Sequence, residues 1–435
     1  MSRRLAVILF SLALIAMSSA LAWMFREMMV AVEVPQLTEM PAQPVRKPVV
    51  KPAAPQVPAT FATPSTTTAD QERPLAETIA EALQNPEAIP GEALLTFKNA
   101  AALAAFRARA AQAGLDIISI DPTLLTARVR YRSLDGLQKD LAEHASDYTN
   151  AGPNLVARIP GLPQQPQKDT ANAGGSTPFR SQGLDLIGAP ANRTGWGSGV
   201  TVAVLDSGVV DHPSLRNTSI THIDLVEDGQ PFHGHGTAMT SLIAGDDPNV
   251  SGVSPATKIL DVRVADPQGN SNTALLASGI VRAIDSGAKI LNISLGSSQT
   301  SPVLEQAVQY ALSRGAVIIA AAGNEQSNAL SYPAGYAGVV SVAAIDANGA
   351  QAWFSNSGQG LTLAAPGVGI VSAYTANKLV IGSGTSQAAA ITSGVAAYLA
   401  GRGYQTTNIS TVLARSARPT GAAQTAVGAG ILRIP

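Results

Sequence analysis

The chain has 435 residues, enough for about three domains, and 46% of its side chains are hydrophobic but only 4% aromatic. Its 29 basic and 30 acidic side chains leave a formal net charge of −1, which excludes the broad basic surface of a nucleic-acid-binding protein, so we expect no nucleic-acid partner. It has no cysteine, which excludes disulfides, thiolate zinc sites, iron–sulfur clusters and a cysteine nucleophile.

The first 25 residues differ in composition from the rest. A basic start, Ser2-Arg3-Arg4, precedes an apolar run over residues 5–17 and an A-x-A-like end at 18–22. This order is typical of a secretory signal peptide, so we assign residues 1–25 to one and expect an exported protein, either secreted, periplasmic or in the cell envelope. Apolar character continues to Phe25, so an uncleaved anchor in the membrane is the alternative.

Two segments have the composition of linkers. Residues 26–75 include nine prolines between Pro35 and Pro74, and we expect an extended spacer there. Residues 161–180 are polar and rich in glycine and proline, and form a second linker. The linkers delimit a small domain at 76–160 and a large one at 181–435.

The small domain alternates strand and helix patterns. We expect strands at 93–98, 116–120, 126–131 and 154–159, and helices after Asn99, a good N-cap, and around Leu134, Leu137 and Leu141. The order βαββαβ predicts a small α+β domain of the ferredoxin-like type. It contains no cluster of catalytic side chains, since His144 stands alone.

The large domain contains nearly continuous runs of Val, Ile and Ala, separated by helical patterns. The runs cover residues 200–205, 258–264, 289–295, 316–321 and 339–345. Runs without polar alternation indicate strands that are covered on both faces. We therefore expect a doubly wound α/β domain with a mostly parallel sheet.

Four side chains stand at places where such a sheet carries its active residues. Asp206 directly follows the first run, and Asn324 follows the fourth. His235 lies between two glycines before an apolar helix at 238–244, and Ser386 precedes an Ala-rich helix at 387–400. Each alone has an ordinary explanation as a turn or cap residue.

Together the four residues predict nucleophilic catalysis. An imidazole accepts the proton of a serine when a carboxylate holds its other nitrogen, and an amide donor completes an oxyanion hole. An α/β-hydrolase places its nucleophile before its acid and histidine, whereas no histidine follows Ser386. The order Asp–His–Ser excludes that fold.

Six segments occur in one order along the large domain. They are Val202-Ala203-Val204-Leu205-Asp206-Ser207-Gly208, His235-Gly236-Thr237, Asn292-Ile293-Ser294-Leu295-Gly296, Ala321-Ala322-Gly323-Asn324, Ala365-Pro366-Gly367 and Gly384-Thr385-Ser386. In this order they resemble the motifs of subtilisin-like serine peptidases, the subtilase family. The similarity extends from about residue 181 to the end and implies a subtilisin-like fold and an endopeptidase that forms an acyl-enzyme.

The resemblance also implies a role for each matching residue. Ser386 would attack the peptide carbonyl, His235 would act as base and then acid, and Asp206 would orient His235. The side chain of Asn324 and the backbone N–H of Ser386 would hold the oxyanion. The protein or peptide substrate would bind as a strand between two edges, formed by Ser294, Leu295 and Gly296 and by Gly269, Asn270 and Ser271.

Four departures from the family pattern affect these expectations. Ala238 replaces a histidine, and Gln387 replaces the methionine that usually follows the nucleophile, so we expect activity to resist peroxide. The helix after it lacks the usual Pro-His pair. The loop 245–252 is shorter than the calcium-binding loop of many relatives. Although Asp246, Asp247 and Asn249 offer oxygen ligands, we favour a solvated turn and expect no metal and no required cofactor.

The small domain resembles the inhibitory propeptide of such enzymes in element order and position. This implies a monomeric precursor that its own propeptide inhibits in cis until a cut within residues 160–180. Two alternatives remain open: a catalytically silent scaffold of the same fold in the cell envelope, and a peptide ligase or cyclase that passes the acyl group to an amine.

Overall fold

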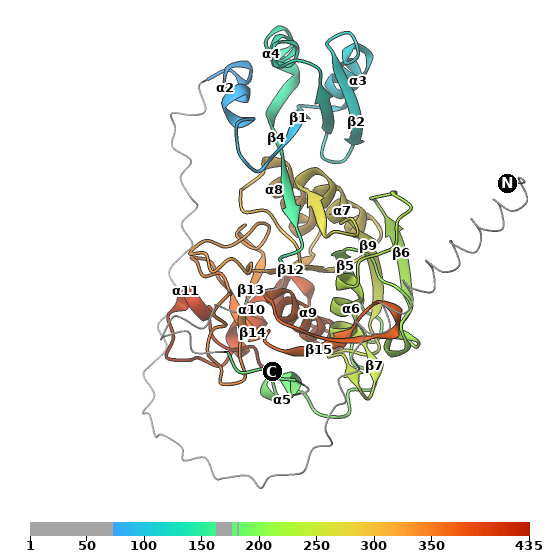
Figure 1. Ribbon diagram of the computed structural model, residues 1–435, viewed down its shortest axis with the longest axis vertical. Helices are drawn as coiled ribbons and strands as arrows, with labels where there is room; N and C mark the ends of the chain where they lie inside the picture. Colours follow the sequence, from blue (N-terminus) through green and yellow to red (C-terminus); the bar gives the residue numbers. More distant parts are fainter. Residues whose placement is uncertain (1–72, 162–175, 181) are drawn as a thin grey trace, which may run out of the picture. The chain divides into compact units, whose positions relative to one another are not determined.

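The computed structural model describes residues 73–161, 176–180 and 182–435, which all belong to one unit, Thr67–Pro435 (Figure 1). The predicted signal segment 1–25, nearly all of the spacer and most of the second linker lie outside the described residues. Among the helices of the described part, none is long and apolar enough to span a bilayer.

The N-terminal part of the described chain is a small α+β domain. Its elements are α2 (Leu75–Ala82), β1 (Ala88–Phe97), α3 (Ala100–Arg109), β2 (Leu115–Asp121), β3 (Thr126–Tyr131), α4 (Leu134–Glu143), the 3₁₀ turn η1 (Ala145–Asp147) and β4 (Tyr148–Arg158). The strands pair antiparallel in the order β4-β1-β3-β2, so the elements from β1 to β4 have the expected ferredoxin-like order. Helix α2 lies outside the elements that the sequence predicted.

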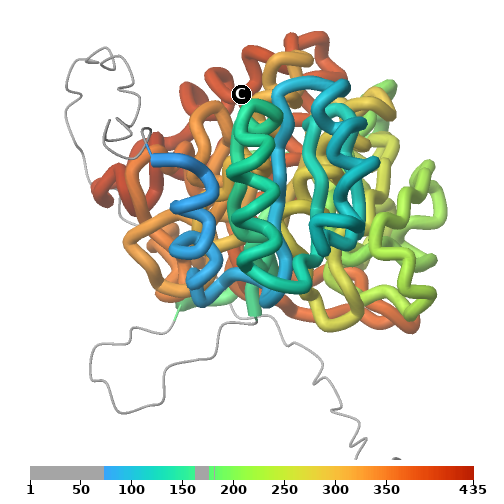
Figure 2. Tube along the Cα trace, turned by 90° about the horizontal axis from the view of Figure 1, so that it is seen from above, coloured from blue at the N-terminus to red at the C-terminus, as the bar shows by residue number. Residues whose placement is uncertain are grey.

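Local chemistry explains where the two main helices of this domain begin. Asn99 and Ser133 accept hydrogen bonds from backbone N–H groups in the first turns of α3 and α4. Both helices lie on the same side of the sheet in Figure 2, and a core that includes Phe97, Phe106 and Leu137 lies between the layers.

The large domain is built on a seven-stranded sheet in which every neighbouring pair is parallel. Its strands, in spatial order, are β14 (Leu363–Pro366), β13 (Val340–Ile345), β12 (Val317–Ala321), β11 (Ile290–Ile293), β5 (Thr201–Asp206), β9 (Lys258–Arg263) and β6 (Ile220–Asp224). The five predicted apolar runs form its five inner strands. The doubly wound α/β fold is thereby confirmed.

Helices cover both faces of this sheet. On one face α6 (His235–Ala244) packs with α9 (Thr385–Gly401), and on the other α7 (Thr273–Asp285) packs with α8 (Pro302–Ser313). The remaining elements are α5 (Gly183–Leu186), η2 (Pro213–Leu215), β7 (Asp246–Asp247), β8 (Val250–Ser251), β10 (Asn270–Asn272), β15 (Ile370–Ala373), η3 (Thr375–Asn377), β16 (Leu379–Gly382), α10 (Thr406–Ser416) and α11 (Gln424–Val427).

Several boundaries differ from the sequence-based expectation: β1 and β4, for example, begin at Ala88 and Tyr148 rather than at residues 93 and 154. The second linker was expected to reach residue 180, but Phe179 is buried and donates its backbone N–H to the carbonyl of Val368. The last residues of 161–180 therefore belong to the large domain. His235 and Ser386 also lie inside the first turns of α6 and α9 rather than before these helices, because the N-caps are Gly234 and Gly384.

Candidate active site

The buried carboxylate of Asp206 positions the imidazole ring of His235. Asp206 ends β5 and is fully buried, and His235 Nδ1 donates to its Oδ1 and Oδ2, at 2.9 and 3.0 Å. Ser207 donates its backbone N–H and its hydroxyl to Oδ1 of the same carboxylate. Helix α6 approaches this closely because Gly236 has no side chain: a Cβ there would lie 2.4 Å from the carbonyl oxygen of Gly208. The pairing leaves Nε2 as the nitrogen able to accept a proton.

The candidate nucleophile stands in the first turn of α9. Ser386 is the second residue of this helix, is 2% exposed, and donates its Oγ–H to the carbonyl of Ser294 at 3.3 Å. Among the hydrogen bonds between described residues, none joins Ser386 to His235. A helix start directs backbone N–H groups and the positive end of the dipole toward a developing negative charge.

The orientation of the Asn324 amide is set by its neighbours. Its Oδ1 accepts the backbone N–H and the Oγ–H of Thr385, both at 2.9 Å. Thr385 Oγ in turn accepts the N–H of Gly323 at 3.1 Å. Because Oδ1 is occupied, Nδ2 is left as a donor, and no described residue accepts from it. It lies 3.0 Å from where a Cβ of Gly384 would be.

These residues meet at one edge of the sheet. Asp206, Ser294 and Asn324 stand at or just after the carboxyl ends of β5, β11 and β12, which are neighbouring strands. The start of α9 contacts two of them, since Ser386 bonds to Ser294 and Thr385 to Asn324. Such an edge is where doubly wound sheets carry their active residues.

The last strand of the N-terminal domain runs along this edge. Strand β4 pairs antiparallel with β10, and Arg158 exchanges two hydrogen bonds with Gly296, at 2.8 and 3.0 Å. Ile159 donates its N–H to the carbonyl of Gly269 at 2.9 Å. The segment is thus the middle strand of three. Its partners are the two edges that the sequence analysis named for substrate binding.

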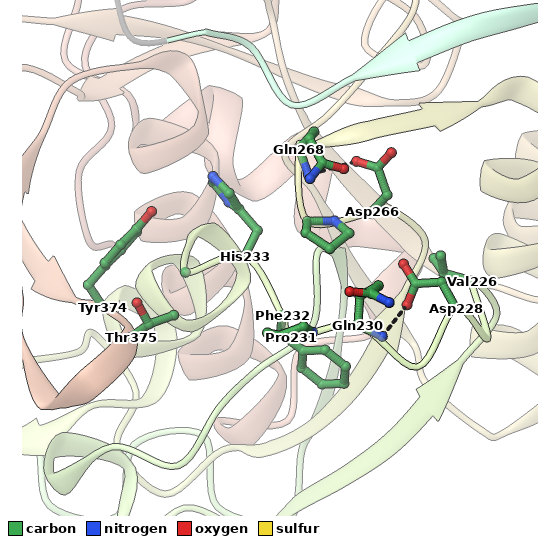
Figure 3. Close-up of a pocket in the computed structure, with 12 residues that line it drawn as sticks. Val226, Asp228, Gln230, Pro231, Phe232, His233, Asp266, Gln268, Tyr374 and Thr375 are labelled. Carbon is green, nitrogen blue, oxygen red and sulfur yellow. Dashed lines mark hydrogen bonds between the residues drawn. The ribbon is translucent and has the colours of Figure 1, made fainter. Parts of the chain in front are cut away.

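A cavity of about 690 Å³ adjoins His235, and its lining includes His233, Tyr374 and Asp266 (Figure 3). His233 Nδ1 accepts the backbone N–H of His235 at 3.2 Å, so its proton is on Nε2. Burial, and after it the charge of His235, lowers the pKa of His233. His233 therefore stays neutral near pH 7 and adds no positive charge beside His235.

The loop that offered oxygen ligands is closed by its own hydrogen bonds. Asp247 Oδ1 accepts the backbone N–H and the side-chain amide of Asn249, and Asp246 Oδ2 accepts the amide of Asn217. Within the described ranges no three His, Asp or Glu side chains are grouped to hold a metal ion.

Two supporting residues escaped the sequence analysis. Ser207 fixes Asp206 through its backbone N–H, and its one hydroxyl proton is shared between Asp206 Oδ1 and the carbonyl of His233, while Thr385 fixes Asn324. Both are small hydroxyl residues next to a candidate residue, and both lie inside motifs that had been recognised. Their position in the motifs was the available signal. The partner of Thr385 lies 61 positions away, whereas Ser207 bonds to its immediate neighbour Asp206 and to His233, 26 positions away.

Comparisons with known proteins show which family the chain resembles. Residues 197–430 match the model of the subtilase family. A thermostable alkaline protease of Halalkalibacterium halodurans is 40% identical over 222 residues, which are 50% of this chain and 61% of that protein. Thermitase of Thermoactinomyces vulgaris is 36% identical over 246 residues, 55% of this chain and 88% of that protein.

One solved structure has the same fold over a larger share of the chain. Fervidolysin from Fervidobacterium pennivorans, a keratinolytic enzyme related to subtilisin, has the same fold with a TM-score of 0.67 at 24% identity, over 80% of this chain and 61% of that one. The chain spans 61% of the alkaline protease and 57% of a thermophilic serine proteinase from Bacillus strain AK1.

Proposed function

The chain belongs to the subtilase family, and on that premise we propose that it is a serine endopeptidase. Ser386 Oγ adds to the substrate carbonyl while His235 Nε2 accepts its proton, and Asp206 stabilises the resulting imidazolium. The Asn324 amide and the N–H of Ser386 bind the oxyanion. The leaving amine takes the proton from His235, and water then hydrolyses the acyl-enzyme. The observation that carries this proposal is the hydrogen-bonded pair of His235 and buried Asp206 at the edge where Ser386 and Asn324 meet.

The substrate is a protein or peptide in extended form. The pairing of Arg158 and Ile159 with Gly296 and Gly269 supports this, because main-chain bonds on both sides of a strand bind any sequence that can extend. The cavity beside His235 begins next to Gly269, at Gln268, and can receive a substrate side chain. None of these steps requires a cofactor or a metal, and we propose that the enzyme acts as a monomer.

The N-terminal domain is proposed to keep the precursor inactive. A strand that pairs with both edges of the cleft excludes other peptides from it. Residues 154–159 of the same chain are that strand. We also propose that the precursor is exported, on the composition of residues 1–25.

The test is hydrolysis of an unstructured protein, with processing followed in the same samples. The wild type should lose its N-terminal domain and hydrolyse the added protein, while Ser386→Ala should remain an uncut precursor without activity. A Ser383→Ala variant, altered three residues earlier, is the control and should behave as the wild type. Normal hydrolysis by Ser386→Ala would contradict the proposal, as would transfer of the acyl group to an added amine as the main reaction.

A further inference from the structure

The pairing register locates one peptide bond of this chain beside Ser386. Arg158 and Gly296 exchange both of their hydrogen bonds, so they form a hydrogen-bonded pair of an antiparallel ladder. In such a ladder the next pair of this kind is two residues further along one strand and two residues back along the other. Continued in the same register, Pro160 lies opposite Ser294, although among the described residues no backbone hydrogen bond joins the two and the bridge at Arg158 and Gly296 is an isolated one. Because Ser386 Oγ bonds to the carbonyl of Ser294, Pro160 is the residue beside the nucleophile.

Pro160 removes one backbone hydrogen bond that this pair would otherwise form. The carbonyl of Ser294 would accept the N–H of the residue opposite, but Pro160 has no N–H. The carbonyl instead accepts the hydroxyl of Ser386 at 3.3 Å. The proton that Ser386 must give to His235 is therefore engaged elsewhere, and the strand is one hydrogen bond short at the residue to be attacked.

From this register we propose that the first cut in the precursor is the bond between Pro160 and Gly161, and that Pro160 makes this cut slow. The proposal rests on the proposed function and adds which peptide bond is cut first and what sets the rate of that cut. Ser386 Oγ adds to the Pro160 carbonyl carbon and its proton passes to His235. The amine of Gly161 leaves with that proton, and water hydrolyses the ester to free the Pro160 carboxylate. The slow cut gives the large domain time to finish folding while its cleft is filled.

The experiment follows the full-length chain after refolding, by intact mass and N-terminal sequencing at the earliest times. We expect Gly161 as the first new N-terminus. Pro160→Ala restores the missing donor, so it should be cut at the same bond about fivefold faster, the effect of one net hydrogen bond. Pro153→Ala, on the same strand but paired with Ala93 inside the N-terminal domain, is the matched control and should be cut at the wild-type rate.

The outcomes separate this proposal from the proposed function. A cut that needs Ser386 but falls first at another bond overturns the bond assignment alone, and an unchanged rate in Pro160→Ala overturns the role of proline. A cut that persists in Ser386→Ala overturns self-processing itself. Thermal unfolding of the Pro160→Ala, Ser386→Ala double variant checks that the substitution leaves the fold intact, which we expect because Pro160 is half-buried at the end of the strand.

Discussion

At the scale of single residues, the site depends on side chains that use one polar atom to bond to the protein and keep another available for the substrate. Asn324 illustrates this, because Thr385 occupies its Oδ1 twice and leaves Nδ2 as a donor. A donor fixed before the reaction begins needs no reorganisation when negative charge develops. Thr385 is therefore as much a part of the proposed oxyanion hole as the amide that it orients.

Asn324→Ala should lower kcat by about 10²–10³ with a much smaller change in KM, because the lost bond forms mainly in the transition state. The magnitude is the one known for the amide donor of a subtilisin. Steady-state kinetics on a peptide substrate measure it. Asn249→Ala, in the exposed turn after Asp247, is the control, and an equal kcat in both variants would contradict the assignment.

A second prediction at this scale concerns Gln387 and the resistance of the activity to peroxide. It follows Ser386 and is 6% exposed, and the only methionine of the described ranges, Met239, is fully buried. Peroxide converts an accessible methionine to its sulfoxide but does not oxidise an amide at a comparable rate. Activity measured after peroxide treatment should stay near its starting value in the wild type and fall in Gln387→Met. Rapid loss in both proteins would count against this explanation.

The sequence was sufficient to name Asp206, His235, Asn324 and Ser386 because each lies in a short motif after a strand or at a helix start. It was not sufficient to show how Thr385 and Asn324 interact. Their contact joins residues 61 positions apart and exists only once α9 has docked against the end of β12.

At the scale of elements, a strand could be predicted from the sequence where both of its faces are buried. The five inner strands of the sheet have apolar residues on both faces, so their runs are easy to recognise. The edge strand β6 escaped prediction because two of its five residues, Thr221 and His222, are polar and exposed. The other edge strand, β14, is only four residues long and ends at Pro366, and the C-terminal Ile431 and Leu432 cover it.

Strands β6 and β9 carry a hydrogen-bonded pair, His222 and Asp261. Asp261 is 1% exposed, and its Oδ2 accepts the N–H of Val209 and the Nδ1–H of His222, both at 2.9 Å. The hydrogen bond to Asp261 raises the pKa of His222, to which the nearby charge of Asp211 also contributes. Burial raises the pKa of Asp261, and the neighbouring Asp206 acts in the same direction. The folded chain thus holds protons that the unfolded chain releases.

The pair should make stability fall as pH rises. A raised pKa of His222 contributes stability that is complete below the ordinary value of 6.5 and is lost as pH passes the folded value. As pH rises above about 6.5 the free energy of unfolding should therefore fall, and only slightly, because solvent screens the half-exposed ring. Denaturant unfolding of Ser386→Ala with and without His222→Gln measures it. The same slope in both would show that His222 is not its source.

At the scale of the whole molecule, a buried polar contact joins the two domains. Asn154 is fully buried. Its Nδ2 donates to Glu92 of the N-terminal domain at 2.9 Å. Its Oδ1 accepts the N–H of Ala274 and the hydroxyl of Thr273, which begin α7 of the large domain. Burial raises the pKa of Glu92, but the hydrogen bonds from Arg128 and Asn154 outweigh it, and the net pKa is lowered. Glu92 therefore stays charged at neutral pH, and this support is lost only in acid, below about its ordinary value of 4.5.

Removing Asn154 should release the N-terminal domain sooner. Asn154→Ala leaves Glu92 and the N–H of Ala274 without this partner, a cost of about 1–3 kcal/mol, which corresponds to roughly 5- to 150-fold. The delay before activity appears in a refolded precursor should shorten accordingly. Asn150→Ala, on the same strand, forms no side-chain bond to the large domain and is the matched control. Equal delays in the two variants would contradict the role of this contact.

The central claim is that Ser386 is a nucleophile that the N-terminal domain covers until the chain is cut. A fluorophosphonate reacts with an activated serine, so labelling followed by peptide mapping tests this claim directly. We predict a single adduct, on Ser386, in protein that has lost its N-terminal domain, and little adduct in the uncut chain. Absence of the adduct from fully processed, folded protein would contradict the account.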